Sequence, residues 1–210
     1  MPTRREIIAR IETPLTALYG EREARQIARI VVMELGGLCL TDLVAEPDKE
    51  LGIDELDRII GELAAGRPLQ YVLGHTEFYG LDFQVREGVL IPRPETEELA
   101  QQVIASAEEG DNILDLCTGS GAVAIAVYKE LEKSRRKANV TAADVSGDAL
   151  ALARENAETN GADVTFVQSD LFSRIRGRYN IIVSNPPYIP TKDIEGLQRE
   201  VREFEPRLAL

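Results

Sequence analysis

The sequence predicts an α/β protein in which a small helical domain precedes a parallel sheet. Short apolar runs, typical of buried strands, occur near residues 113, 140, 165 and 182. Helical patterns follow the first two runs, and a strand–helix alternation of this kind favours parallel strands. Before residue 74, apolar residues recur instead at helical spacing.

Residues 1–74 form the predicted helical domain. One apolar stripe runs from Ile7 to Leu18, and a second runs from Ala24 to Leu35, before a pair of glycines. A last helix is expected from Ile53 to Leu63, with acidic residues in its first turn. These stripes favour a helical core over a cofactor groove.

Two further segments complete the predicted organisation. Residues 75–91 alternate apolar and polar side chains around Tyr79-Gly80 and Glu87-Gly88, which predicts a β-hairpin linking the domains. Residues 92–210 then form the α/β domain. Pro94 is expected in the first turn of a helix, where the following acidic residues lie near the positive end of the helix dipole.

A glycine-containing turn follows the first strand of this domain. The strand at 112–116 leads into Cys117-Thr118-Gly119-Ser120-Gly121, and a helix is expected from Ala122. Small residues let a ligand approach the backbone, and the exposed N–H groups of a helix start attract an anionic group. The turn alone is a weak signal, because Cys117 stands where a dinucleotide fingerprint could have its first glycine.

Acidic residues follow the next two strands. Asp144 ends the second strand, where a carboxylate can bind both hydroxyls of a ribose, and Ser146 is expected to cap the next helix. The third strand, at 164–167, leads to Asp170, which could accept from an adenine amino group, with Leu171 against the ring. Each acid alone is more simply a solvated strand end. Together with the glycine turn they predict a site for S-adenosylmethionine (SAM).

The tetrapeptide Asn185-Pro186-Pro187-Tyr188 follows an apolar run at 179–184 that is typical of a buried strand. An Asn side-chain oxygen and a main-chain carbonyl can each accept one N–H of a planar amide or amine, which aims its nitrogen at an electrophile. Pro186 precedes another proline, which fixes where its carbonyl points, and Tyr188 could lie against the acceptor. A proline-rich turn is the alternative for this tetrapeptide alone.

Several segments together resemble the release factor glutamine methyltransferases, also called HemK or PrmC. The resemblance is carried by 67–74, 78–80, 90–97, 115–121 and 185–188, and the Ile-Pro-Arg-Pro-Glu-Thr-Glu segment is its most specific part. It implies a Rossmann-like SAM-dependent sheet and N5-methylation of the glutamine in the Gly-Gly-Gln motif of class I peptide chain release factors. It also implies that the helical domain helps to hold the release factor.

The same resemblance implies roles for individual residues. The residues from Cys117 to Gly121 (Cys117, Thr118, Gly119, Ser120 and Gly121), together with Asp144, Leu171 and Asn185, would contact SAM. Asn185, Pro186, Pro187 and Tyr188 would hold the substrate glutamine, with Asn185, Pro186 and Tyr188 as the catalytic group. Cys117 often corresponds to glycine in the family, and Leu171 to a large aromatic residue in some members. Neither departure removes a needed polar group.

Composition limits the partners and the compartment. With 24 basic and 36 acidic residues, the net charge is −12, whereas a nucleic-acid enzyme is expected to carry a basic face. Two cysteines give no disulfide framework, and no signal-peptide or membrane-spanning stretch is visible, so a cytoplasmic protein is expected. The single histidine, His75, cannot build a metal site alone.

Two alternatives stay open. An exocyclic-amine methyltransferase acting on DNA or RNA could present the same Asn-Pro-Pro-Tyr to a flipped adenine. A non-catalytic SAM-binding fragment is the other, because the family sheet continues beyond the helix expected at 194–204. The sequence thus predicts a C-terminally incomplete sheet in which the strand at 181–184 lacks one neighbour and the short form associates or loosens.

Overall fold

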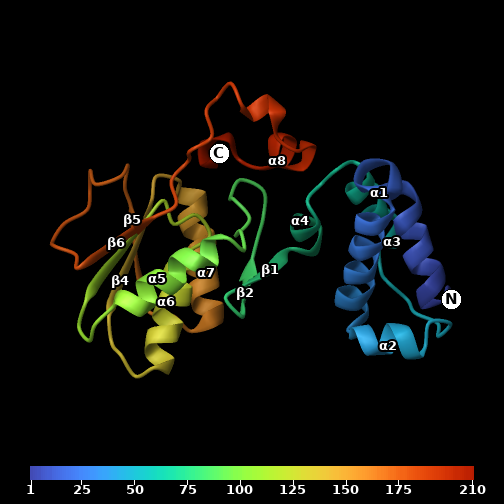
Figure 1. Cartoon of the computed structure of the whole chain (residues 1–210), viewed down its shortest axis with the longest axis horizontal. Helices are drawn as coiled ribbons and strands as arrows, with labels where there is room; N and C mark the ends of the chain where they lie inside the picture. Colours follow the sequence, from blue (N-terminus) through green and yellow to red (C-terminus); the bar gives the residue numbers. More distant parts are fainter. The chain divides into compact units, whose positions relative to one another are not determined.

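The computed structural model describes every residue from Met1 to Leu210 and divides them into two compact units, Met1–Leu73 and Gly74–Leu210 (Figure 1). None of the helices combines the length and the apolar character needed to cross a membrane.

The first unit is helical. It contains α1 (Arg4–Gly36), α2 (Leu40–Ala45), α3 (Leu56–Ala64) and α4 (Leu69–Leu73). The Thr3 hydroxyl accepts from the Glu6 N–H, while the Glu6 carboxylate accepts from the Thr3 N–H, so a capping box starts α1. Gly20 interrupts α1 with φ 78° and ψ 165°, so the two predicted apolar stripes lie on separate helical stretches. Their buried residues pack together with those of α3.

Two expectations for this unit were wrong in detail. Leu18 and Leu35 are largely exposed, although both were assigned to the buried stripes. Each lies within the last turn before the chain leaves the helix, so it has few neighbours to pack against. The third helix begins at Leu56 and not near Ile53, because Glu55 adopts φ 55°, which an α-helix cannot contain.

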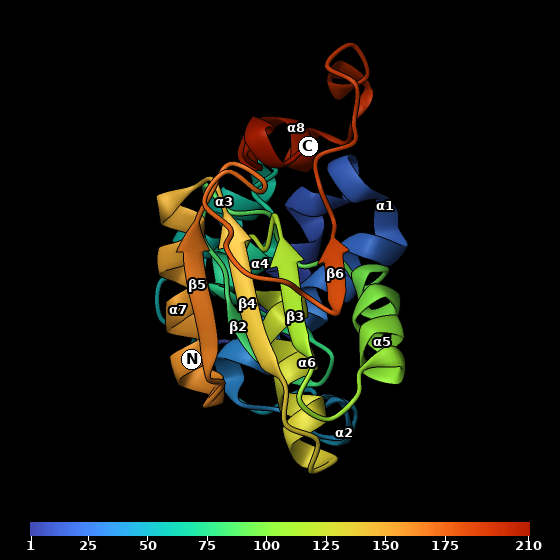
Figure 2. The same cartoon turned by 90° about the vertical axis from the view of Figure 1, so that its left-hand side faces the viewer.

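The second unit is built on a four-stranded parallel sheet. Its strands are β3 (Asn112–Leu116), β4 (Asn139–Asp144), β5 (Val164–Gln168) and β6 (Ile181–Ser184), in the spatial order β5-β4-β3-β6 (Figure 2). The parallel α/β fold is therefore confirmed. The chain moves from β3 outward through β4 to β5, and then returns to the other side of β3. Open α/β sheets bind ligands at such a reversal, beyond the carboxyl ends of the strands.

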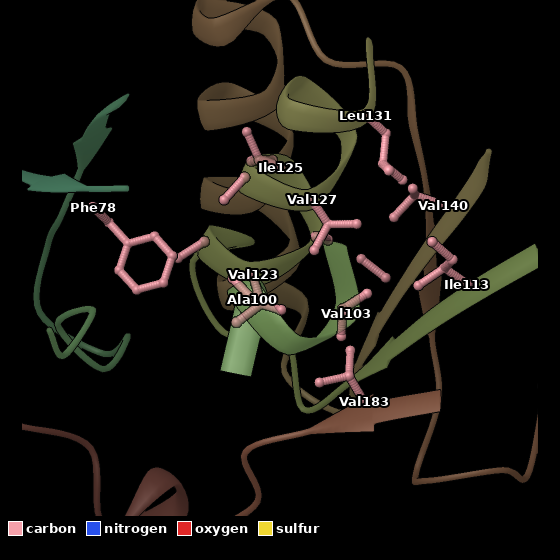
Figure 3. Packing of buried hydrophobic residues seen from close by; sticks show 14 of the residues in the cluster. Phe78, Ala100, Val103, Ile113, Val123, Ile125, Val127, Leu131, Val140 and Val183 are labelled. Atoms are coloured by element: carbon pink, nitrogen blue, oxygen red, sulfur yellow. The ribbon is translucent and has the colours of Figure 1, made fainter. Parts of the chain in front are cut away.

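Three helices cover one face of this sheet, namely α5 (Thr96–Ser106), α6 (Ala122–Lys133) and α7 (Gly147–Asn160). Their apolar side chains form the main core with inward-facing strand residues such as Ile113, Val140 and Val183 (Figure 3). On the opposite face, Ile175 and Tyr179 pack over a smaller apolar cluster. Ser146 caps α7 by accepting from the Ala149 N–H, as predicted.

Two elements near the C-terminus differ in detail from their sequence patterns. The apolar run at 179–184 is typical of a buried strand, yet β6 lies at the sheet edge, pairs only with β3 and leaves Ile182 52% exposed, so the expectation that this strand lacks one neighbour is confirmed. The helix expected at 194–204 is divided into a 3₁₀ turn, η1 (Ile194–Gly196), and α8 (Arg199–Phe204), because Leu197 and Gln198 are extended. A second 3₁₀ turn, η2 (Arg207–Ala209), follows.

The predicted hairpin is present within the second unit. It consists of β1 (His75–Phe78) and β2 (Leu81–Gln84), joined by Tyr79 and Gly80, whose φ values of 53° and 72° match a two-residue hairpin turn. Residues 85–95 continue as a loop. Pro94 therefore precedes α5, which begins at Thr96, and does not lie in its first turn.

One buried side chain fastens this hairpin to the rest of the second unit. Asn156, on α7, is fully buried. Its Oδ1 accepts from the Gln84 N–H at 2.7 Å, and its Nδ2 donates to the Gln84 carbonyl at 3.2 Å and to the Ser120 carbonyl at 3.0 Å. One amide thus connects α7 with β2 and with the turn after β3.

We expect Asn156→Ala to destabilise the protein by about 3 kcal/mol, because it leaves the buried Ser120 carbonyl and two part-buried main-chain groups of Gln84 without their partner. The measurement is urea unfolding followed by circular dichroism. Asn139→Ala is the matched control, since the exposed Asn139 side chain bonds only to that of Asn112, and it should cost less than about 1 kcal/mol. Equal losses in the two variants would contradict this role for Asn156.

Candidate functional site

A cavity of about 360 Å³ lies beyond the carboxyl ends of the parallel strands. This volume falls in the range of small-molecule sites. The turn after β3, the ends of β4 and β5, and the segment after β6 all contribute to its wall. The cavity therefore lies where the strand order reverses, at the strand ends for which the sequence predicted a site.

The turn after β3 forms the floor of the cavity. The residues from Cys117 to Ser120 line it. The backbone enters the left-handed region at Cys117 (φ 59°) and Gly119 (φ 56°), and this orientation brings the main chain to the cavity surface. Gly121 does not line the cavity. A Cβ there would lie 3.0 Å from Ile125 Cδ1 and 3.1 Å from Ala153 Cβ, so this glycine permits close helix packing.

Asp144 holds the backbone around the cavity as well as lining it. One carboxylate oxygen accepts from the Gly119 N–H and the other from the Ser146 N–H, both at 2.9 Å. The side chain thus connects the turn after β3 to the start of α7. Each oxygen retains a further lone pair, so the carboxylate can still accept from a ligand hydroxyl.

Asp170 and Leu171 line the cavity at the end of β5. Leu171 adopts φ 45°, a conformation that is uncommon for a residue with a side chain. Ser169, which is buried, supports this turn, because its hydroxyl donates to the Leu171 carbonyl at 2.7 Å and accepts from the Arg174 N–H at 3.0 Å.

The segment after β6 supplies Asn185 and Pro187 to the cavity wall, whereas Pro186 and Tyr188 do not line it. Asn185 Nδ2 donates to the hydroxyl of Thr96 at 3.5 Å, a long hydrogen bond, while its Oδ1 accepts no hydrogen bond within the chain. Tyr188 is 78% exposed, and its stacking on an acceptor stays a prediction.

Asp115 was not predicted as a site residue, yet its buried side chain lines the cavity. Burial raises the pKa of this carboxyl from 3.8 to about 7, although hydrogen bonds from the Thr118 hydroxyl, at 2.6 Å, and the Ala124 N–H oppose the rise. The sequence signal that could have identified Asp115 is its position as the single acidic residue within the apolar strand β3. Burial also raises the pKa of Cys117, which favours the neutral thiol over a reactive thiolate at pH 7.

Two loops complete the wall, and neither was assigned to the site from the sequence. One covers residues 88–93, and the other contributes Pro206, Leu208 and Ala209. Arg93 Nη2 lies 2.5 Å from Glu205 Oε1, so an ion pair connects the two loops. Burial raises the pKa of Glu205, even though Arg93 and the Ile91 N–H lower it.

Comparisons with known proteins agree with this geometry. Residues 95–201 match the model of the methyltransferase small domain, and residues 6–74 match that of the PrmC N-terminal domain. A release factor glutamine methyltransferase from Streptococcus pneumoniae is 41% identical over 198 residues, which cover 92% of this chain and 70% of the relative. The chain belongs to this methyltransferase family.

Further members of the family show similar coverage. The release factor glutamine methyltransferase of Geobacter sulfurreducens is 44% identical, with 91% of this chain and 67% of the relative covered. That of Bacteroides thetaiotaomicron is 39% identical, with 97% and 74% covered. The resemblance seen in the sequence is thus confirmed. The protein is a methyltransferase of this family, and its methyl donor is SAM.

We expect the contribution of Asp115 to the stability of the ligand-free protein to fall between pH 4 and pH 7. In this interval the unfolded chain releases the proton that the folded protein still holds on Asp115, so rising pH favours unfolding. A pKa change from 3.8 to about 7 corresponds to a loss of about 4 kcal/mol, complete above pH 7.

Asp115→Asn removes this titration. The melting temperature of the variant minus that of the wild type should therefore increase as pH rises from 5 to 8. Thermal unfolding across that range measures the difference. The exposed Asp163, replaced by Asn, is the control and should show no such trend. A melting-temperature difference that stays constant with pH would contradict the assignment to Asp115.

A second prediction concerns the backbone at Cys117. We expect Cys117→Gly to change stability by less than about 1 kcal/mol, because relief of the left-handed conformation offsets the greater entropy of the unfolded chain. Cys117→Val should cost about 2 kcal/mol or more, since a β-branched side chain tolerates positive φ poorly. Urea unfolding of both variants tests this, and a fully stable Cys117→Val protein would show that the turn relaxes.

Proposed function

We propose that this protein transfers a methyl group from SAM to the side-chain nitrogen of a glutamine in the Gly-Gly-Gln motif of class I peptide chain release factors. The observation that carries the proposal is the arrangement of Asn185. Asn185 lines the cavity, its amide nitrogen donates to the Thr96 hydroxyl, and its side-chain oxygen accepts no hydrogen bond within the chain.

An amide nitrogen is a weak nucleophile because its lone pair is delocalised into the carbonyl group. Asn185 Oδ1 can accept one N–H of the substrate amide, and the Pro186 carbonyl can accept the other. These bonds would orient the nitrogen and stabilise the positive charge that develops on it as the N–C bond forms and the S–CH3 bond breaks. The donor would leave as a neutral thioether, and the surplus N–H proton would pass to water. The Thr96 hydroxyl supports this arrangement, because an Asn side chain whose nitrogen is already bonded presents its oxygen to the substrate.

The charges of the cavity suit a cationic methyl donor. The carboxylates of Asp144 and Asp170 line the cavity, together with the carboxyl of Asp115, which burial leaves partly protonated at pH 7, and Arg93 is the only basic residue among the lining residues. SAM supplies an electrophilic methyl group on a positively charged sulfur, together with an amino acid part and a ribose. Asp144 would accept from the ribose hydroxyls, and Asp170 with Leu171 would bind the adenine.

The helical unit is proposed to hold the release factor. Residues 6–74 match the PrmC N-terminal domain, and the relatives that share this arrangement are named as release factor methyltransferases. The net charge of −12 favours a protein over a nucleic acid as the substrate.

The proposal is tested by incubating the 210-residue chain with SAM and either a class I release factor or an adenine-containing oligonucleotide. Mass spectrometry of the digested release factor should show a single added methyl group on the Gly-Gly-Gln glutamine. Methylation of the oligonucleotide instead would replace this function by the exocyclic-amine alternative. SAM binding without transfer to either would identify the chain as a non-catalytic binding fragment.

We expect Asn185→Ala to lower the rate constant of methyl transfer at saturating SAM by about a hundredfold or more, as for loss of one positioned transition-state hydrogen bond. SAM affinity should fall less, because Asn185 contributes only part of the wall. Thr96→Val, which removes the partner of the Asn185 nitrogen, should lower the rate constant by a smaller factor, and Thr96→Ser should restore it. Single-turnover kinetics and calorimetry measure the two quantities. Equal losses of rate and affinity in Asn185→Ala would make Asn185 a cofactor ligand instead.

A further inference from the structure

The ion pair between Arg93 and Glu205 connects segments that are 112 residues apart in the sequence. The Glu205 side chain is 1% exposed, whereas that of Arg93 is 36% exposed. The Nη2–Oε1 distance is 2.5 Å. The other carboxylate oxygen of Glu205, Oε2, is buried and has no hydrogen-bond partner.

Both partners adjoin the walls of the cavity. Arg93 ends the 88–93 loop, all of whose residues line the cavity. Glu205 directly precedes Pro206, Leu208 and Ala209, which line it from the C-terminal segment. The Arg93–Glu205 ion pair therefore joins the 88–93 loop to the C-terminal segment through side chains.

Stability alone does not account for this arrangement. A buried carboxylate loses its hydration, and an ion pair repays that loss only partly when one carboxylate oxygen stays unbonded. An ion pair without a net gain in stability can still select one arrangement, because Glu205 loses its Arg93 partner in any other placement of the segment.

We propose that Glu205 is a positioning residue that fastens residues 206–209 to the 88–93 loop and thereby closes the methyl-donor cavity. The proposal rests on the proposed function only in assigning that cavity to SAM. Glu205 does not line the cavity, so it acts through the wall residues that follow it.

The test compares Glu205→Gln with Glu203→Gln. Glu203 lies two residues earlier and pairs with Arg199 at 2.9 Å in a more exposed setting, so the same substitution there is a matched control. For Glu205→Gln we expect SAM affinity, measured by calorimetry, to fall about tenfold, which is the effect of losing one charge-assisted hydrogen bond. The KM for SAM should rise by a similar factor while the rate constant at saturating SAM changes little.

Hydrogen exchange of the ligand-free variants provides a readout that does not depend on SAM. Glu205→Gln should exchange faster than wild type at residues 206–210 and in the 88–93 loop, with the strands of the sheet unchanged. Glu203→Gln should leave both segments as in wild type. Arg93→Gln removes the same ion pair by changing its more exposed partner, and it should show the same faster exchange. It replaces Glu205→Gln in the test if that variant folds poorly.

The outcomes separate the two proposals. Unchanged exchange at 206–210 in both Glu205→Gln and Arg93→Gln would overturn the positioning role, whatever the SAM affinity. Faster exchange spread over the whole sheet would also overturn it, since Glu205 would then be a general stabilising residue. If the variants exchange faster only at these two segments and the wild-type protein binds no SAM, the positioning role of Glu205 stands. The assignment of the cavity to the cofactor is then refuted.

Discussion

The buried side chain of Asn156 is the constraint on which the geometry of the second unit depends. A single amide bonds to both main-chain groups of Gln84 and to the carbonyl of Ser120. It therefore sets the distance of the hairpin and of the turn after β3 from the same helix. Because an amide has fixed donor and acceptor directions, neither segment can shift without losing a buried hydrogen bond. The floor of the cavity is thus defined by a residue that does not line it.

Acidic residues of the site also hold the backbone around the cavity in place. Asp144 holds Gly119 and Ser146 through their N–H groups, so this carboxylate organises the turn before any ligand arrives. Asp115 lies beneath the turn and accepts from Thr118. These acidic residues therefore organise the turn in advance, which would reduce the reorganisation that ligand binding requires.

The parts of the fold that depend on local patterns could be predicted from the sequence. The four parallel strands, the hairpin turn at Tyr79-Gly80 and the cap at Ser146 follow from apolar runs, glycine placement and side-chain chemistry. The edge position of β6 was expected from the family resemblance and could not have been predicted from its apolar run alone, because exposure depends on which strands lie beside it. Asp115 was missed because burial, and not residue type, gives it an unusual pKa. The cavity wall formed by residues 88–93 and 206–209 was missed because it joins distant segments, for which periodicity carries no signal.

The distance of Arg93 from Glu205 along the chain has a consequence for how the protein folds. Closing a loop of 112 residues costs more entropy than closing any hairpin or strand–helix turn, so such contacts tend to form late. Interactions absent from the folding transition state act on the unfolding rate and leave the folding rate almost unchanged. A ligand that requires the assembled wall would bind only after this step and would slow the escape from the native state. Kinetic persistence of the fold would then rise with the concentration of the methyl donor.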